Sequence, residues 1–169
     1  MAYDLSKIEF SGEKRYLSNM YPTSILFNKP ILLPDEIIEP TFLTYASSEH
    51  LYQACKSEAL GWHKMLLDLT PEKTKTKARK ALKTLLANNV ETFLIRDNFH
   101  DIKVDVMTAI VSMKFDQNKV LAEKLLAEEG LIEERNCWND RFWGTVEGTG
   151  LDHLGRILRD KKNQLKNRG

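Results

Sequence analysis

The chain of 169 residues contains 42% hydrophobic and 29% charged residues, proportions that are typical of a folded globular protein and exclude a disordered chain. Its 25 basic and 24 acidic side chains give a net charge of +1, so no overall electrostatic attraction draws the protein to nucleic acid or to an anionic membrane. A chain of this length predicts a single domain over residues 1–169 with one binding or active site.

The two cysteines, Cys55 and Cys137, are too few and too far apart in sequence for a disulfide framework or a zinc knuckle. The first residues are charged and contain no apolar core for a signal peptide, and no apolar run is long enough to cross a bilayer. We therefore expect a cytoplasmic protein without membrane contact. The four histidines lack any metal-ligand spacing, so we expect neither a metal site nor a cofactor.

Over residues 1–45, short apolar pieces alternate with Ser, Asn and Pro, a pattern that predicts short strands and loops. The segment 28–40 contains Pro30, Pro34 and Pro40, which a central strand does not accept. We interpret this segment as a loop insertion or as the tip of an extended hairpin.

From Ser47 onward the apolar spacing is helical. Ser47 is a predicted N-cap for a helix that runs to about Leu60, and Gly61 is the predicted stop. Further helices are predicted over residues 71–88, 101–115 and 117–128 and from Leu151 onward, with a short strand at 131–133. In the helix at 101–115, the predicted buried side chains are Ile102, Val106, Ile110 and Met113. The sequence thus predicts an α+β fold, a single helix-rich domain with a few short N-terminal strands.

Three polar side chains share one side of the helix that follows Ser47. Glu49, Gln53 and Lys56 are spaced i, i+4 and i+7, with Tyr52 beside them. A carboxylate, an amide and an amine at these positions can converge on a ligand. The alternative is an ordinary solvated helix face, and the spacing alone does not decide between the two.

Residues 138–155 combine Asp140, an aromatic pair at 142–143 and a Gly148-Thr149-Gly150 turn that precedes a helix. Glycines let the backbone approach a ligand closely, and free amides at a helix start favour a phosphate. The spacing is not a dinucleotide fingerprint, because His153 stands where the third glycine belongs. A plain loop before a helix is the alternative.

Residues 71–83 form a local basic patch. Within this range one acidic residue, Glu72, accompanies Lys73, Lys75, Lys77, Arg79, Lys80 and Lys83. Such a helix can meet a phosphate backbone, and it can equally be a solvated helix surface.

Four blocks in this order resemble the NADAR (YbiA-like) family over about residues 15–160. They are LSNMYP at 17–22, SSEHLYQACK at 47–56, VMTAIVSMKF at 106–115 followed by Gln117 and Asn118, and FWG with GTGLDHLG at 142–155. The resemblance implies a YbiA-like fold and a metal-independent N-glycosidase, a hydrolase that cleaves the bond between ribose C1 and a nitrogen. It implies a small nucleotide-like substrate: either guanine carrying ADP-ribose, as a nucleotide or within DNA, where cleavage reverses ADP-ribosylation, or a phosphorylated ribosylamino-pyrimidine intermediate of riboflavin biosynthesis.

By motif position, the resemblance implies that Glu49 and Lys56 are catalytic. Departure of a base builds positive charge on the sugar, which a carboxylate stabilises, and Lys56 can act as an acid, as a phosphate ligand or as an imine-forming nucleophile. The remaining expected substrate-binding residues are Arg15, Asn19, Tyr52, Gln53, Asp140, Trp143, Gly144, Gly148, Gly150 and Asp152. The chain departs from the family pattern at Asn98, Phe99 and Asp152, which leaves a second hypothesis: a non-catalytic module that binds ADP-ribose or a related nucleotide.

Overall fold

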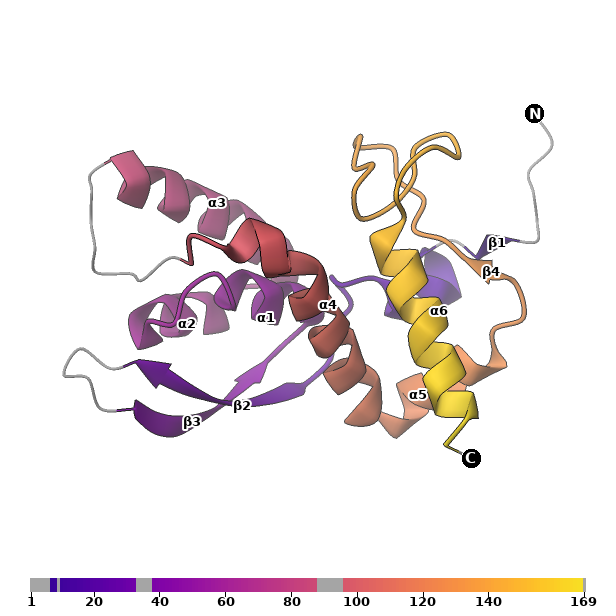
Figure 1. Ribbon diagram of the computed structural model, residues 1–169, viewed down its shortest axis with the longest axis horizontal. Coiled ribbons are helices and arrows are strands. Elements are labelled where there is room, and N and C mark those ends of the chain that lie inside the picture. Colours follow the sequence, from indigo (N-terminus) through magenta and orange to yellow (C-terminus); the bar gives the residue numbers. More distant parts are fainter. Residues whose placement is uncertain (1–6, 9, 33–37, 88–95, 169) are drawn as a thin grey trace. The chain divides into compact units, whose positions relative to one another are not determined.

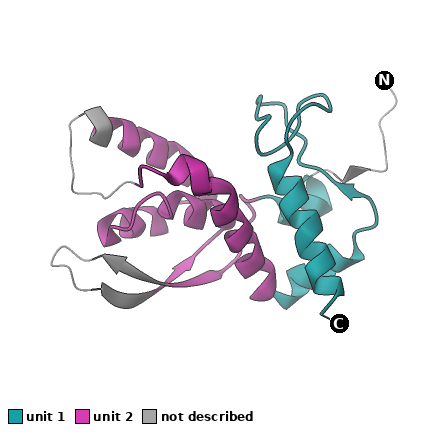
Figure 2. Cartoon of the chain, in the orientation of Figure 1, with its two compact units in different colours: residues 1–18, 118–169 teal, residues 19–117 magenta. Residues whose placement is uncertain are grey.

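Helices make up most of the residues that the computed structural model describes, which are 7–8, 10–32, 38–87 and 96–168 (Figure 1). The fold is α+β and helix-rich, as the sequence predicts. The chain forms two compact units (Figure 2), one of residues 19–117 and one that combines residues 1–18 with 118–169. The predicted single domain over residues 1–169 stays a prediction. Among the described residues, no helix is long and apolar enough to span a membrane.

The unit of residues 19–117 contains a two-stranded antiparallel hairpin. Its strands are β2 (Ile25–Leu32) and β3 (Ile38–Tyr45). Residues 28–32 and 38–40 of the predicted loop insertion are therefore strand, and the extended hairpin is the interpretation that agrees with the structure. Pro30 and Pro40 lie opposite each other in the register. A sheet of two strands has only edge strands, which tolerate proline because one side of each strand needs no N–H donor.

The helix predicted from Ser47 to Leu60 is two helices, α1 (Ser48–Ala54) and α2 (Leu60–Leu67). Ser47 is the N-cap, as predicted, and its Oγ accepts a hydrogen bond from the His50 amide at 3.3 Å. The predicted end is wrong because Ser57 forms a turn in which its Oγ accepts from the Ala59 amide at 3.0 Å. The indole N–H of Trp62 in α2 then donates to the Gln53 carbonyl at 2.9 Å and satisfies an end group of α1.

The next two helices are α3 (Pro71–Ala87) and α4 (Phe99–Asp116). Helix α3 begins at Pro71 as predicted, a position where the missing N–H of proline costs nothing. On α4, the predicted face is partly wrong: Ile110 is buried, whereas Ile102, Val106 and Met113 are half-buried. The buried side chains of α4 are Met107, Ile110, Val111, Lys114 and Phe115. The buried face of α4 is thus rotated about the helix axis from the predicted one. The shift follows from packing, because α4 contacts both α1 and β2.

Two buried histidines fasten α1 and α2 to their surroundings. His50 Nε2 donates to the Leu69 carbonyl at 2.6 Å while its Nδ1 accepts from the Ser47 hydroxyl at 2.8 Å. His63 Nε2 donates to the Ser57 carbonyl at 2.9 Å, and its Nδ1 accepts from the Tyr45 hydroxyl. Burial lowers the pKa of His63. The unfolded chain therefore binds more protons below the ordinary pKa of 6.5, and stability falls as the pH decreases through that range.

We expect Tyr45→Phe to lower the free energy of unfolding by about 1 to 3 kcal/mol, because it leaves the buried Nδ1 of His63 without a donor. Urea unfolding measures the change. Tyr21→Phe is the matched control, since the Tyr21 hydroxyl forms no hydrogen bond with the residues that the structure describes. This substitution should change the free energy of unfolding by less than about 0.5 kcal/mol. Equal effects of the two substitutions would contradict the role of the Tyr45 hydroxyl.

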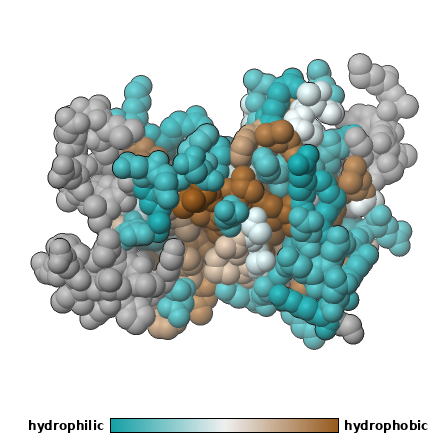
Figure 3. All heavy atoms as spheres, in the orientation of Figure 1, coloured by the Kyte–Doolittle hydropathy of each residue, from teal (hydrophilic) through white to brown (hydrophobic). Residues whose placement is uncertain are grey.

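The unit of residues 1–18 and 118–169 begins with β1 (Lys7–Ile8), which pairs in parallel with β4 (Leu131–Ile132). The short strand predicted near Leu131 is thus confirmed. The 3-10 helix η1 (Gly12–Leu17) follows β1, and the helices of this unit are α5 (Lys119–Ala127) and α6 (His153–Lys166). On α6, Leu154, Ile157 and Leu158 are buried. Hydrophilic side chains cover the side of α6 that faces the viewer in Figure 3.

Candidate functional site

Helix α1 is buried along its whole length, and it carries an acidic and an amide side chain inward. Glu49 is 6% exposed and Gln53 is 4% exposed, so the solvated-face alternative is wrong for both. Gln53 Nε2 donates to Glu49 Oε1 at 2.8 Å, which orients the carboxylate. Gln53 Oε1 is buried without a hydrogen-bond partner. A buried acceptor in this state costs free energy that a ligand hydroxyl would recover.

Lys56 lies in the turn after α1, above two aromatic rings. Its Nζ is 5.6 Å from the ring centroid of Tyr52 and 5.7 Å from that of Phe99. The two rings pack edge to face with centroids 5.3 Å apart. Burial lowers the pKa of Lys56, the Glu49 carboxylate opposes this effect, and the charges of Lys75 and Arg79 add to it. A lysine with a lowered pKa gives up its proton more readily than an exposed one.

Asn19 joins this group through its backbone, because its carbonyl accepts from the Glu49 amide at 3.0 Å. The unit of residues 19–117 thus brings together Asn19, Glu49, Tyr52, Gln53 and Lys56. We refer to these five residues as the α1 cluster. The i+7 spacing is not what places Lys56 there, because α1 ends at Ala54. Its position comes from the turn, which the Arg96 amide holds by donating to the Lys56 carbonyl at 2.9 Å.

Three neighbours of the α1 cluster are absent from the predicted site residues. Phe99, at the first turn of α4, appears in the sequence only as a departure from the family pattern. Lys75 and Arg79 appear only as members of the basic patch. The basic patch indicates that cations gather on this helix. No local feature of the sequence distinguishes Lys75 and Arg79, whose charges affect the pKa of Lys56, from the four other cations of the patch.

The other predicted residues belong to the unit of residues 1–18 and 118–169. Asp140 Oδ1 accepts from the amides of Phe142 and Trp143 at 3.1 and 2.9 Å, a side-chain turn that fixes the aromatic pair. The rings of Phe142 and Trp143 lie edge to face with centroids 5.0 Å apart. His153 lies 4.5 Å from the Phe142 ring and 6.2 Å from the Trp143 ring. Asp140 therefore positions the half-buried indole.

Two of the predicted glycines permit close backbone packing. A Cβ on Gly144 would lie 2.2 Å from the Glu134 carbonyl oxygen, and one on Gly150 would lie 2.2 Å from the Gly144 carbonyl oxygen. A larger residue at either position requires the loop to shift. Gly148 lies in an exposed part of this loop. Ligand contacts of the three glycines stay predictions, because the packing alone already accounts for Gly144 and Gly150.

Asp152 precedes α6 and uses both carboxylate oxygens within its own unit. Oδ1 accepts from the Glu134 amide at 2.9 Å, and Oδ2 pairs with Arg159 Nη1 at 2.9 Å. Arg15 is exposed on η1. Substrate contacts by Asp152 and Arg15 also stay predictions, and the geometry of Asp152 gives it a structural role in addition.

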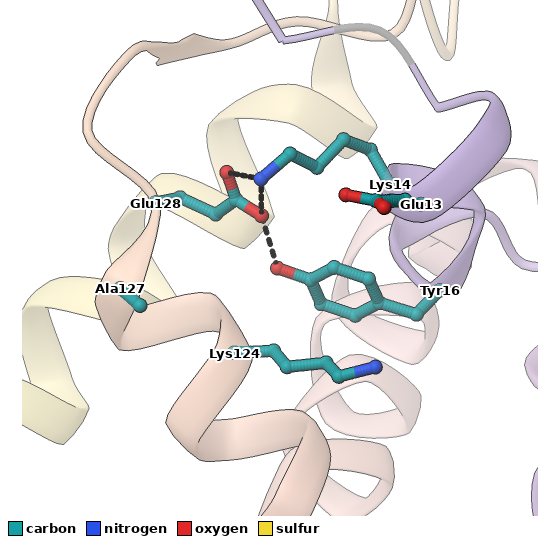
Figure 4. A pocket seen from close by; sticks show the side chains of 6 residues that line it. All are labelled: Glu13, Lys14, Tyr16, Lys124, Ala127 and Glu128. Atoms are coloured by element: carbon teal, nitrogen blue, oxygen red, sulfur yellow. Dashed lines mark hydrogen bonds and ion pairs between the residues drawn. The ribbon is translucent and has the colours of Figure 1, made fainter.

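A pocket of about 370 Å³ lies in the same unit (Figure 4). Its lining residues are Glu13, Lys14, Tyr16, Lys124, Ala127 and Glu128. The buried Glu128 carboxylate accepts from Lys14 Nζ at 2.7 Å and from the Tyr16 hydroxyl at 2.7 Å. Burial and this carboxylate raise the pKa of Tyr16. These hydrogen bonds tie η1 to the end of α5.

The α1 cluster as defined contains neither a histidine nor a cysteine. Within the described residues, no group of three or more His, Cys, Asp or Glu side chains is placed to hold a metal ion. Neither Cys55, which is half-buried, nor Cys137, which is exposed, is part of a disulfide. The side chains of Glu49, Gln53 and Lys56 supply a carboxylate, an amide and an amine to the cluster.

The chain resembles two groups of known proteins in sequence. It is 30% identical over 152 residues to riboflavin biosynthesis protein VVA0006 of Vibrio vulnificus, which covers 89% of this chain and 35% of the relative. It is 28% identical over 151 residues to the chloroplastic riboflavin biosynthesis protein PYRR of Zea mays, covering 88% of this chain and 23% of that protein. The chain thus spans about a third or less of these relatives. N-glycosidase YbiA of Escherichia coli is 29% identical over 126 residues, which are 72% of this chain and 71% of YbiA.

The NMR structure of Escherichia coli YbiA has the same fold, with a TM-score of 0.69 at 23% identity. The superposition covers 96% of this chain and 86% of YbiA. The NADAR domain model matches residues 9–166, a range that includes the α1 cluster and the loop that carries Trp143. The protein therefore belongs to the NADAR domain family.

Proposed function

We propose that this protein is an N-glycosidase that hydrolyses the bond between ribose C1 and a nitrogen of a nucleobase-like leaving group. The observation that carries the proposal is the buried Glu49–Gln53 pair with its unpaired amide oxygen, next to Lys56. Membership of the NADAR family supports it, as does the similarity to a protein named N-glycosidase YbiA.

The reaction needs the charges that the α1 cluster supplies. As the C1–N bond breaks, its electron pair leaves on the nitrogen and positive charge develops on the sugar ring. The Glu49 carboxylate stabilises this charge and orients a water molecule. The water oxygen bonds to C1, and one of its protons passes to Glu49. The leaving nitrogen takes a proton, so that the products are ribose with a C1 hydroxyl and the free base.

Lys56 is the proposed donor of that proton. Burial lowers its pKa, which suits a group that must release a proton during the reaction. An attack of the amine on C1 is the competing role, and it would leave an imine with the opened sugar. Borohydride treatment during turnover distinguishes the two roles, because only the imine is trapped as a stable adduct of the protein.

The other predicted residues bind the substrate in this proposal. Gln53 Oε1 accepts a ribose hydroxyl, which is the partner it lacks. Asn19 binds the sugar as well. Stacking of the base on the indole of Trp143 stays a prediction from the family blocks. The substrate is either a phosphorylated ribosylamino-pyrimidine intermediate of riboflavin biosynthesis or guanine that carries ADP-ribose, free or within DNA.

Incubation of the purified protein with both substrates, followed by mass spectrometry of the released base, tests the proposal. We expect release of base from one of the two, without added metal. Calorimetry with ADP-ribose serves as the comparison. Saturable binding of ADP-ribose without release of base from either substrate would contradict the enzyme and favour the non-catalytic binding module.

A further inference from the structure

The ammonium of Lys56 lies over two aromatic rings that come from different helices. Its Nζ is 5.6 Å from the ring centroid of Tyr52 on α1 and 5.7 Å from that of Phe99 on α4. The two rings meet at an interplanar angle of 63°. Both distances are within the range in which a ring face attracts a cation. Because the rings are set at an angle, together they define one position for Nζ at the end of a flexible side chain.

Backbone hydrogen bonds hold Phe99 in place beside Lys56. The Arg96 amide donates to the Lys56 carbonyl at 2.9 Å, and the Arg96 carbonyl accepts from the Phe99 amide at 3.1 Å. One residue thus connects the turn after α1 to the first turn of α4. The Arg96 guanidinium pairs with the Glu58 carboxylate, so this connection adds no net charge. Helices α1 and α4 also contact each other directly. The position of the Phe99 ring is therefore fixed by the backbone as well as by the ring contact.

The two rings offset part of the effect of burial on the Lys56 amine. Burial lowers the pKa of Lys56, the Glu49 carboxylate raises it, and the charges of Lys75 and Arg79 lower it. A ring face attracts the ammonium and has no comparable attraction for the neutral amine. The rings therefore act on this pKa in the same direction as Glu49. A protonated Lys56 is what the proposed role as proton donor needs.

We propose that Phe99 is a positioning residue for Lys56, which with Tyr52 fixes the ammonium at one place in the α1 cluster and favours its charged form. The inference rests on the proposed function for the step that Lys56 serves. It favours the proton donor over the imine-forming nucleophile, because an amine attacks C1 only without its proton. Phe99 stands where the chain departs from the family pattern, and its aromatic ring is the property that this role requires.

The test follows the Cε–H groups of the lysines by NMR through a pH titration of the full-length protein, grown with isotope-labelled lysine. Lys56→Arg identifies the Lys56 signal. We expect this signal to lie upfield of that of Lys119, whose side chain is 90% exposed, because ring currents shield protons above a ring face. Phe99→Leu should reduce the upfield shift and lower the pKa of Lys56 by about 0.5 or more, since the charged form loses an attraction. Phe99→Tyr keeps a ring face and should keep both properties.

The matched control is Phe27→Leu. Phe27 is also half-buried in the unit of residues 19–117, and its ring packs edge to face with Tyr45 at 6.0 Å and stacks with His63 at 6.5 Å. This substitution removes a ring of the same kind and should leave the Lys56 signal and its pKa unchanged. Circular dichroism and thermal unfolding verify that the variants fold, and Phe99→Met takes the place of Phe99→Leu if the latter does not.

The outcomes separate this role from the proposed activity, because the titration needs no turnover. A pKa that falls in Phe99→Leu and not in Phe27→Leu supports the role of Phe99 even if no base is released. Three results overturn it: no upfield shift of Lys56 in the wild type, equal changes in both leucine variants, or a Phe99→Tyr protein that behaves like Phe99→Leu. Where base is released, the rate should decline as the pH rises above the pKa of Lys56, and Phe99→Leu should move this decline to lower pH. A decline that stays in place contradicts the role.

Discussion

Replacement of Glu49 by glutamine is expected to lower the rate of base release by about 10³-fold or more, because the neutral amide neither stabilises the sugar cation nor accepts a proton from water. The fold should be retained. Glutamine has nearly the same shape, and its amide oxygen can still accept from Gln53 Nε2, which bonds to Glu49 Oε1 at 2.8 Å in the wild type. Single-turnover measurement of the released base gives the rate, and urea unfolding gives the stability.

The matched control for this substitution is Glu123→Gln. The Glu123 side chain on α5 is 63% exposed, and its loss should leave the rate within about 2-fold of the wild type. A Glu49→Gln protein that keeps more than a tenth of the wild-type rate would show that another group stabilises the sugar. A protein that no longer folds would show instead that the carboxylate is needed for structure.

The second large effect concerns Lys114 and the pH dependence of stability. Lys114 is 1% exposed on α4, and burial lowers its pKa from 10.5 to about 7. Below pH 7 both the folded and the unfolded protein hold the proton. Between pH 7 and 10.5 only the unfolded chain holds it, so this group makes stability rise with pH. Over two pH units the rise is about 2 to 3 kcal/mol.

Lys114→Met should remove this rise, because methionine fills a similar volume and does not titrate. Urea unfolding at pH 7, 8 and 9 measures it for the variant and the wild type. Lys119→Met provides the control, since the Lys119 side chain is 90% exposed and its removal should leave the wild-type slope unchanged. Identical slopes in the wild type and in Lys114→Met would mean that Lys114 is not the group that titrates.

Features with local causes could be predicted from the sequence. Ser47 caps α1 and Pro71 starts α3 where expected, because capping and the geometry of proline depend only on the nearest residues. The strand at Leu131 and the helix around residues 101–115 also occur as predicted. The family blocks include all the residues of the α1 cluster. The helical spacing of Glu49, Gln53 and Lys56 led us to expect that their side chains converge on a ligand.

Features with tertiary causes could not be predicted. The break between α1 and α2 combines the local turn at Ser57 with the bond from the Trp62 indole to the Gln53 carbonyl, and helical spacing gives no hint of this bond. The burial of Lys114 comes from packing on two sides of α4, which no amphipathic pattern indicates for a lysine. The environment of Lys56 depends on Phe99, Lys75 and Arg79, all of which are distant in sequence.

The indole of Trp62, which donates to the Gln53 carbonyl in α1, is an intrinsic fluorescent probe of this helix. Trp62 is fully buried, Trp143 is half-buried and Trp138 is 63% exposed, so the enclosed Trp62 ring is expected to emit furthest to the blue of the three. Since the Trp62 indole is bonded to the backbone of Gln53, its fluorescence follows the integrity of the helix that bears Glu49. Intrinsic emission thus allows the state of this region to be followed in any variant without attachment of a dye.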